Sequence, residues 1–257
     1  MRAVRGGASA MRMNTTLVIN PKGGSGKTTL AVNLASHFAA DGIPTAVMDY
    51  DAQGSSLNWL KQRAPHAPRI HGANAAPQRG NRLRSIEMHV PAGIQQLIID
   101  APAGASGLVL QEMLSRADCI IIPVAPSAID IHATANFIRD LLLTGRIRVR
   151  NIRLAVVANR VRRSIPVYQP LERFLGSLNL PLVARLSDSD VYLKAAELGL
   201  GIFEMDFSMS FAEREQFAPI VKWVDNQQPV PASADEKVIE LPLPRLPAVF
   251  RTRPVLG

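Results

Sequence analysis

A glycine-rich turn near the N-terminus carries residue types suited to binding phosphate. Residues 22–29 read Lys-Gly-Gly-Ser-Gly-Lys-Thr-Thr, between a short apolar run and a stretch with helical spacing. Three glycines let backbone N–H groups converge on phosphate oxygens, and the following helix adds the partial positive charge of its N-terminus. Lys27 would neutralise the terminal phosphates of a nucleotide, and the Thr28 hydroxyl would ligate Mg²⁺. The turn is therefore predicted to be a nucleotide-binding loop that spans Pro21 to Thr29.

This loop departs from the ordinary phosphate-binding pattern. In G-x-x-x-x-G-K-[ST] the first glycine stands five residues before the second, and here that position holds Pro21. A further lysine, Lys22, follows it. The glycines and the following helix still supply the physics that phosphate binding needs, so the loop is retained as a candidate with an unusual entry.

Acidic residues end two of the apolar runs that follow the loop. Asp49 and Asp51 stand at alternate positions in Met48-Asp49-Tyr50-Asp51, so on a strand their side chains point to the same side. The alternative is a pair of surface acids that cap a turn. Asp100 ends the run Leu97-Ile98-Ile99, in the form that delivers one carboxylate toward the water ligands of a metal ion.

Apolar runs and helical stretches alternate along the chain and would position these side chains. This alternation predicts an α/β fold: a doubly wound, mostly parallel sheet with helices on both faces, whose ligands bind at the carboxyl ends of the strands. Residues 63–84, rich in Pro, Arg, Asn and Gly, read as a loop with room for a short strand. Strands are expected at 15–19, 45–50, 97–99, 120–124, 154–158 and 182–184, and helices at 27–40, 108–115, 131–143, 170–178, 191–198 and 209–224.

The predicted domain organisation is one folded unit with two tails. Residues 1–13 read as a flexible extension, and translation could also begin at Met11 or Met13. Residues 14–224 form the P-loop domain. Residues 225–257 hold repeated prolines, which break helices, and are predicted to be a disordered tail.

The chain is basic, which favours an anionic partner. Its formal net charge is +8, and the 225–257 tail contains four basic and four acidic residues, so the excess belongs to residues 1–224. Residues 141–171 hold seven arginines and no acid. A solvated arginine-rich face is the alternative to a binding surface for nucleic acid or an acidic membrane.

The loop sequence resembles the deviant Walker A motif, K-G-G-x-G-K-[ST], of the ParA/MinD family of dimerising ATPases. Two further segments agree: residues 49–54 resemble D-x-D-P-Q-G with Ala52 in place of proline, and residues 199–204 resemble G-x-x-[VI]-F-E. The resemblance spans about Thr15 to Asp206. It implies ATP and Mg²⁺ as cofactors and a homodimer in the ATP-bound state.

The resemblance also implies roles for individual residues. Lys22 would reach into the nucleotide of the partner subunit, and Asp51 would orient or activate the attacking water. Asp49 would support the Mg²⁺ shell together with Asp100, and Asn159 would contact the adenine base. The predicted catalytic residues are thus Lys22, Lys27 and Asp51; the metal site is Thr28, Asp49 and Asp100; and ATP is bound by Lys22, Gly23, Gly24, Ser25, Gly26, Lys27, Thr28, Thr29 and Asn159.

Among relatives of this type, the ParA-like positioning branch fits best. One cysteine cannot hold the iron–sulfur cluster of nitrogenase-type iron proteins, and a proline-broken tail is unlike the amphipathic membrane helix that ends MinD-like proteins. No helix-turn-helix stands before the loop to read operator DNA. The expected protein is a cytoplasmic, nucleoid-associated ATPase without a transmembrane segment.

This branch implies a cycle of positioning or partitioning. The ATP dimer would bind DNA nonspecifically, carry a plasmid, a chromosome or a protein assembly such as a carboxysome or chemotaxis cluster, and be released by slow, Mg²⁺-dependent hydrolysis that an activator or adaptor protein stimulates. The alternative is an ATP-dependent partner-recruiting module, or a MinD-like membrane-associated regulator, with little hydrolysis. The predicted DNA contacts are Arg160, Arg162, Arg163, Arg185 and Lys194.

Overall fold

A computed structural model describes most of the predicted folded unit. The described residues are 12–77, 84–125, 127–143, 147, 151–162, 169–177 and 179–226. Nearly all of the 1–13 extension and the 225–257 tail therefore lie outside them, and the predicted domain limits stay predictions.

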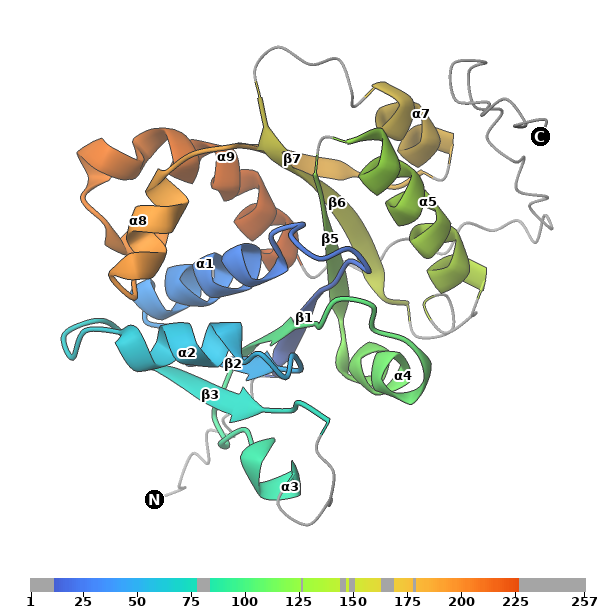
Figure 1. Ribbon diagram of the computed structural model, residues 1–257. Helices are drawn as coiled ribbons and strands as arrows, with labels where there is room; N and C mark the ends of the chain where they lie inside the picture. The colour runs from blue at the N-terminus through green and yellow to red at the C-terminus, as the bar shows by residue number, and fades with distance from the viewer. Residues whose placement is uncertain are drawn as a thin grey trace, which may run out of the picture.

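A parallel sheet forms the centre of the described part (Figure 1). Its seven strands lie in the order β3-β2-β4-β1-β5-β6-β7, and every neighbouring pair is parallel. Most strands are almost entirely buried, as expected for a sheet that is covered on both faces. The strands are β1 (Asn14–Val18), β2 (Thr45–Asp49), β3 (Ile70–Asn74), β4 (Gln96–Asp100), β5 (Cys119–Val124), β6 (Arg153–Val161) and β7 (Leu182–Ser187).

Helices cover both faces of this sheet. On one face α1, α2, α8 and α9 pack together with the short 3-10 turn η2, and on the other face lie α4, α5 and α7 (Figure 1). The apolar side chains divide accordingly into two core clusters, one on each side of the sheet. The bounds are α1 (Lys27–Ala40), α2 (Ser55–Gln62), α3 (Arg84–Glu87), α4 (Gly107–Arg116), α5 (Ala128–Leu143), α7 (Gln169–Ser177), α8 (Val191–Glu197), η2 (Ile202–Glu204) and α9 (Phe207–Asp225).

The predicted fold class is confirmed: the chain forms a doubly wound, parallel α/β sheet of the P-loop type. Each predicted strand and helix is present within a few residues of its expected limits. Two helices, α2 and α3, were not predicted, and β3 is the short strand for which the 63–84 loop left room. Among the described residues no helix is both long enough and apolar enough to span a membrane.

Candidate active site

The glycine-rich loop joins β1 to α1 at the carboxyl edge of the sheet. Gly26, the residue before α1, has a φ of 91°, in the left-handed region that favours glycine. A Cβ at this position would lie 2.0 Å from Nδ2 of Asn159. Glycine is therefore needed here both for its backbone conformation and for its missing side chain.

Lys27 opens α1 and lies under the loop. Its side chain is largely buried, with the residue 8% exposed, and its Nζ donates a hydrogen bond to the carbonyl of Lys22 at 3.1 Å. Burial lowers the pKa of Lys27, while the charges of Asp100 and Asp51 act in the opposite direction and raise it. The ammonium group is thus held between the loop and two carboxylates, where it can neutralise a bound phosphate.

Lys22 stands at the rim of the loop. Its backbone N–H donates to Oδ1 of Asn20 at 2.9 Å, and its Nζ lies 3.8 Å from Oδ1 of Asp130 at the start of α5. The Lys22 side chain is 43% exposed, so it remains accessible from solvent. In this structure the lysine that was predicted to act across a dimer pairs with an acid of its own chain.

Asn20 fixes the entry of the loop, a function that the sequence did not reveal. It is buried at the end of β1, and its Nδ2 donates to the carbonyl of Pro123 at 2.6 Å and to Oγ1 of Thr134 at 3.0 Å. A second contact links the loop to the segment after β4, because the Gly104 N–H donates to the Pro21 carbonyl at 2.9 Å. The available signal was a polar residue directly after the apolar run Leu17-Val18-Ile19.

Asp100 ends β4 with a buried carboxylate. The residue is 1% exposed, and neither carboxylate oxygen has a hydrogen-bond partner among the described residues. Burial, followed by the charge of Asp49, raises the pKa of Asp100 to about 7, while Lys27 and the nearby hydroxyls of Thr28 and Ser56 lower it. Those hydroxyls are close without forming hydrogen bonds of ordinary geometry. A buried carboxylate of this kind is costly unless a cation or donor compensates it.

Mg²⁺ fits these residues. The carboxylate of Asp100 and the hydroxyl of Thr28 are hard oxygen donors, which Mg²⁺ prefers. No group of three or more His, Cys, Asp or Glu side chains that could hold a metal occurs in the described part of the chain. An ion here would therefore keep several water ligands and share phosphate oxygens, as Mg²⁺ commonly does in nucleotide sites.

The carboxylate of Asp49, on the neighbouring strand β2, accepts hydrogen bonds from the first turn of α2. Its Oδ2 accepts hydrogen bonds from the Ser56 N–H at 3.1 Å, the Ser56 hydroxyl at 2.7 Å and the Leu57 N–H at 3.3 Å. Its Oδ1 accepts from the Asp51 N–H at 2.9 Å. These contacts are those of an acid that caps a helix, in a fully buried position. Its support of a metal's water shell stays a prediction.

Asp51 lies in the turn between β2 and α2 and is partly buried. Its Oδ1 accepts from the Gln53 N–H at 2.9 Å, and its carbonyl accepts from the Gly54 N–H at 2.9 Å. It is close enough to Lys27 to raise the pKa of that ammonium. The structure thus brings Asp51, Lys27 and Asp100 to one place, while the catalytic role of Asp51 stays a prediction.

The far end of α2 is held by a buried ion pair. The guanidinium of Arg63 donates to both carboxylate oxygens of Glu204, at 2.6 and 2.9 Å, and the two side chains are 7% and 6% exposed. It also donates to the Gly199 carbonyl and lies 4.8 Å from the ring centroid of Trp59. Trp59 Nε1 donates to the Leu200 carbonyl at 3.3 Å. The Asp51 turn is therefore carried by a helix that is fixed at both ends.

Asn159 lies against the phosphate loop. It is 6% exposed near the end of β6, and its Nδ2 donates to the Ser25 carbonyl at 2.9 Å. The side chain thus supports the turn at Gly26. A contact between Asn159 and adenine stays a prediction.

Two of the predicted DNA contacts are already paired with acids. Arg162, at the end of β6, donates to Oδ2 of Asp188 at 3.1 Å, and Arg185 on β7 pairs with Glu172 of α7. All four side chains are at least partly exposed, so water and salt screen these pairs. DNA phosphates would have to compete with the two acids.

The other predicted contacts differ in accessibility. Arg160 and Lys194 are exposed, on β6 and α8, and no ion pair with either is formed within the described ranges. Arg163 lies outside the described residues, as do three arginines of the basic run, Arg146, Arg148 and Arg150.

Arg153 corrects the prediction that the whole basic run offers charge to a partner. It is 9% exposed, and its guanidinium donates to the carbonyls of Trp223 at 2.7 Å and Val224 at 3.0 Å. It therefore satisfies carbonyls of the last turn of α9, which have no partner within the helix. A run of charges in the sequence does not tell which side chains a strand turns inward.

Comparison with known proteins agrees with this geometry. Residues 16–199 match the family described as the CobQ/CobB/MinD/ParA nucleotide binding domain. The chain belongs to this family. The predicted membership of the ParA/MinD family is thereby confirmed.

Relatives of the family point to its ParA-like positioning branch. The chain is 30% identical over 178 residues to the maintenance of carboxysome distribution protein A of Gloeobacter kilaueensis, covering 65% of this chain and 80% of that protein. The protein of the same name from Halothiobacillus neapolitanus is 23% identical over 196 residues, covering 74% and 87%. The septum site-determining protein MinD of Pyrococcus horikoshii, solved with Mg-ADP, shares the fold with a TM-score of 0.61 at 17% identity, covering 85% and 100%.

Proposed function

We propose that this family member binds ATP with Mg²⁺ at the glycine-rich loop, hydrolyses it slowly, and uses the nucleotide state to switch between a monomer and a DNA-bound dimer. The observation that carries the proposal is the buried Asp100 carboxylate, without a partner among the described residues, beside Lys27 and Thr28. This arrangement is unfavourable when empty and favourable with a metal-bound phosphate. Nucleotide complexes among the structural neighbours support the same cofactors.

The chain's own residues divide the chemistry between them. Bound Mg²⁺ would neutralise phosphate charge, with Thr28 as a ligand and Asp100 holding its waters. Lys27 places an ammonium group at the terminal phosphates, where negative charge develops during transfer. Asp51, next to Lys27, would orient the attacking water and accept its proton.

Lys22 would complete the site of a partner subunit. Its partly exposed ammonium lies 3.8 Å from the Asp130 carboxylate. Such a long ion pair at an exposed position costs little to break. The phosphates of a nucleotide on the partner offer far more negative charge. Dimerisation would therefore exchange the Asp130 contact for a contact across the interface.

DNA would bind along the carboxyl edge of β6 and β7. Arg160 lies near the end of β6 and Arg162 directly follows this strand, while Arg185 of the neighbouring strand β7 is in register with Ala158 of β6. Such a surface reads no bases, so affinity would come from phosphate neutralisation and decrease steeply with salt. The cargo would be a protein assembly of the carboxysome type, as the names of the relatives suggest, linked by an activating adaptor protein in the nucleoid.

The test compares oligomeric state, DNA binding and ATP turnover in the full chain. Light scattering and DNA co-sedimentation are measured with ATP, with ADP and without nucleotide. We expect a dimer and DNA binding with ATP alone, and Asp51→Ala should keep the ATP dimer while slowing turnover at least tenfold. Equal DNA binding in all three states would refute the switch. Tight ATP binding without any turnover would favour the partner-recruiting alternative.

A further inference from the structure

The end of β6 departs from regular strand geometry beside the phosphate loop. Its pairing with β7 shifts register between Ala158 and Val161. Asn159 and Arg160 together lie opposite one residue of β7, Leu186, and form a β-bulge. Arg160 has a φ of 54°, in the left-handed region that residues other than glycine seldom adopt. Bulges of this kind redirect side chains and are frequent next to active sites.

The bulge buries Asn159 against the phosphate loop and leaves Arg160 exposed to solvent. The Asn159 side chain meets the loop at two consecutive residues. Its Nδ2 donates to the Ser25 carbonyl at 2.9 Å, and a Cβ on Gly26 would lie 2.0 Å from the same nitrogen. The amide therefore packs so closely against the turn that a displacement of one would displace the other.

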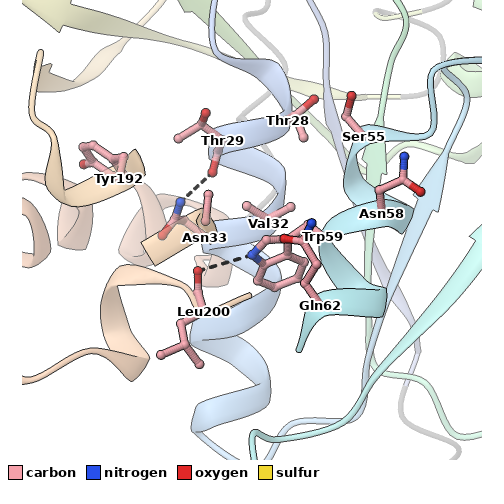
Figure 2. Close-up of a pocket in the computed structure, with 11 residues that line it drawn as sticks. Thr28, Thr29, Val32, Asn33, Ser55, Asn58, Trp59, Gln62, Tyr192 and Leu200 are labelled. Carbon is pink, nitrogen blue, oxygen red and sulfur yellow. Dashed lines mark hydrogen bonds between the residues drawn. The ribbon is translucent and has the colours of Figure 1, made fainter. Parts of the chain in front are cut away.

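The loop is open on the side of α2. Figure 2 shows Thr28 and Thr29, in the first turn of α1, near Ser55 of α2 at the end of an open depression of about 340 Å³. Asn159 does not line this depression and reaches the loop from β6. Lateral support for the turn that precedes α1 therefore comes from the β6 side.

The hydrogen bond from Asn159 fixes the direction of a peptide group. In a planar trans peptide the carbonyl and the following N–H point in opposite directions. Because the Ser25 carbonyl is held against the buried Asn159 amide, the N–H of Gly26 is directed away from it, toward the concave side of the loop. Backbone N–H groups that converge there are the groups that bind phosphate oxygens.

We propose that Asn159 is a positioning residue of the nucleotide site, which orients the Gly26 N–H toward a bound phosphate and does not read the base. The inference rests on the proposed binding of ATP with Mg²⁺. It assigns Asn159 to the phosphates in place of the adenine contact that the family resemblance implies. A contribution made through the loop is equal for adenine and guanine nucleotides and for pyrophosphate, which has no base.

The test compares three ligands that share the phosphates and differ in the base. Binding of Mg-ADP, Mg-GDP and Mg-pyrophosphate to the full chain is measured by isothermal titration calorimetry, with the unaltered protein and with Asn159→Ala. The variant should bind each ligand about fivefold more weakly, the usual effect of one hydrogen bond, and the three factors should agree within twofold.

Three results of this comparison would overturn the proposal. A loss confined to Mg-ADP would assign Asn159 to the adenine base. Unchanged binding of all three ligands would remove Asn159 from the site. An unaltered chain that binds Mg-ADP but not Mg-pyrophosphate would show that the loop does not hold phosphates by itself.

Asn14→Ala is the matched control for a merely structural effect. Asn14 is 6% exposed, as Asn159 is, and its Nδ2 also donates a side-chain hydrogen bond, to Oε1 of Gln96 at 3.3 Å. It opens β1, however, at the opposite edge of the sheet from the loop. Asn14→Ala should destabilise the protein in urea and leave the affinity for all three ligands unchanged. Equal weakening of binding in both variants would overturn the proposal.

A measurement on the unaltered chain does not depend on the folding of any variant. The side-chain amide signal of Asn159 is followed in ¹⁵N NMR spectra with Mg-pyrophosphate and, separately, with adenosine. We expect pyrophosphate to shift this signal saturably and adenosine to leave it in place, and the reverse would overturn the proposal. An unaltered chain that does not bind Mg-ADP would refute the proposed nucleotide site itself, whereas unequal losses in Asn159→Ala refute only the role of Asn159.

Discussion

Replacing Asp100 by asparagine should stabilise the nucleotide-free protein in a pH-dependent way. Burial raises the pKa of Asp100 from 3.8 to about 7, so between about pH 4 and 7 the folded protein keeps a proton that the unfolded chain has released. The free energy of unfolding therefore decreases as the pH rises through this window and levels off above it. A pKa shift of this size lowers the free energy of unfolding at high pH by at most about 4 kcal/mol.

Asparagine at position 100 has no proton to lose, so the free-energy cost of ionising a buried carboxylate is removed. The free energy of unfolding of Asp100→Asn, relative to that of the unaltered protein, should increase by about 3 kcal/mol between pH 5 and pH 8. About two pH units of the Asp100 titration lie in that interval. Urea unfolding at the two pH values, with EDTA and without nucleotide, measures this difference. The constant cost of a buried amide cancels in the comparison.

A control variant and a ligand experiment complete this test. Asp140→Asn, at a position on α5 where the carboxylate is 69% exposed, should change stability by less than about 0.5 kcal/mol at either pH. Mg-ADP should stabilise the unaltered protein more than Asp100→Asn, because the metal compensates the carboxylate. An advantage of Asp100→Asn that is equal at pH 5 and pH 8 would refute the claim that an ionised, uncompensated acid lies at this site.

Three further changes test the loop and the helix that carries Asp51. Lys27→Ala should abolish binding of a fluorescent ADP analogue while the far-UV circular dichroism stays unchanged, and retained binding would remove Lys27 from the site. Gly26→Ala should weaken the same binding at least tenfold, because the φ of 91° and the Asn159 side chain both oppose a Cβ; normal affinity would contradict this. Arg63→Met should lower the free energy of unfolding by about 3–5 kcal/mol in urea, since Glu204 is left buried without its partner, and adding Glu204→Gln should restore part of it.

The sequence predicted the parts of the fold that depend on local pattern. All-apolar runs such as Leu97-Ile98-Ile99 become buried parallel strands, and the glycine spacing in residues 22–29 specifies the turn before α1 whatever lies around it. The order of the motifs along the chain then places Lys27, Asp51 and Asp100 at one edge, because the carboxyl ends of parallel strands meet there.

The elements that the sequence did not reveal depend on distant contacts. The α2 sequence Ser-Ser-Leu-Asn-Trp-Leu-Lys-Gln is mostly polar, and this helix is stabilised by the Asp49 carboxylate at one end and Glu204 at the other. β3 is an edge strand with one buried residue, Ala73. The inward orientation of Arg153 follows from the last turn of α9, whose carbonyls accept its hydrogen bonds and which no local pattern of the strand encodes.

The Arg63–Glu204 pair also has a consequence for how the chain is made. Its two residues are 141 positions apart, so α2 cannot reach its final surroundings until the ribosome has released Glu204. The phosphate loop and the Asp51 turn are synthesised early, but α2, which carries the Asp51 turn, cannot complete its native contacts until η2 has been synthesised. A nascent chain stopped before Glu204 would present Arg63 and Trp59 uncovered, and we expect chaperones to hold this half during translation.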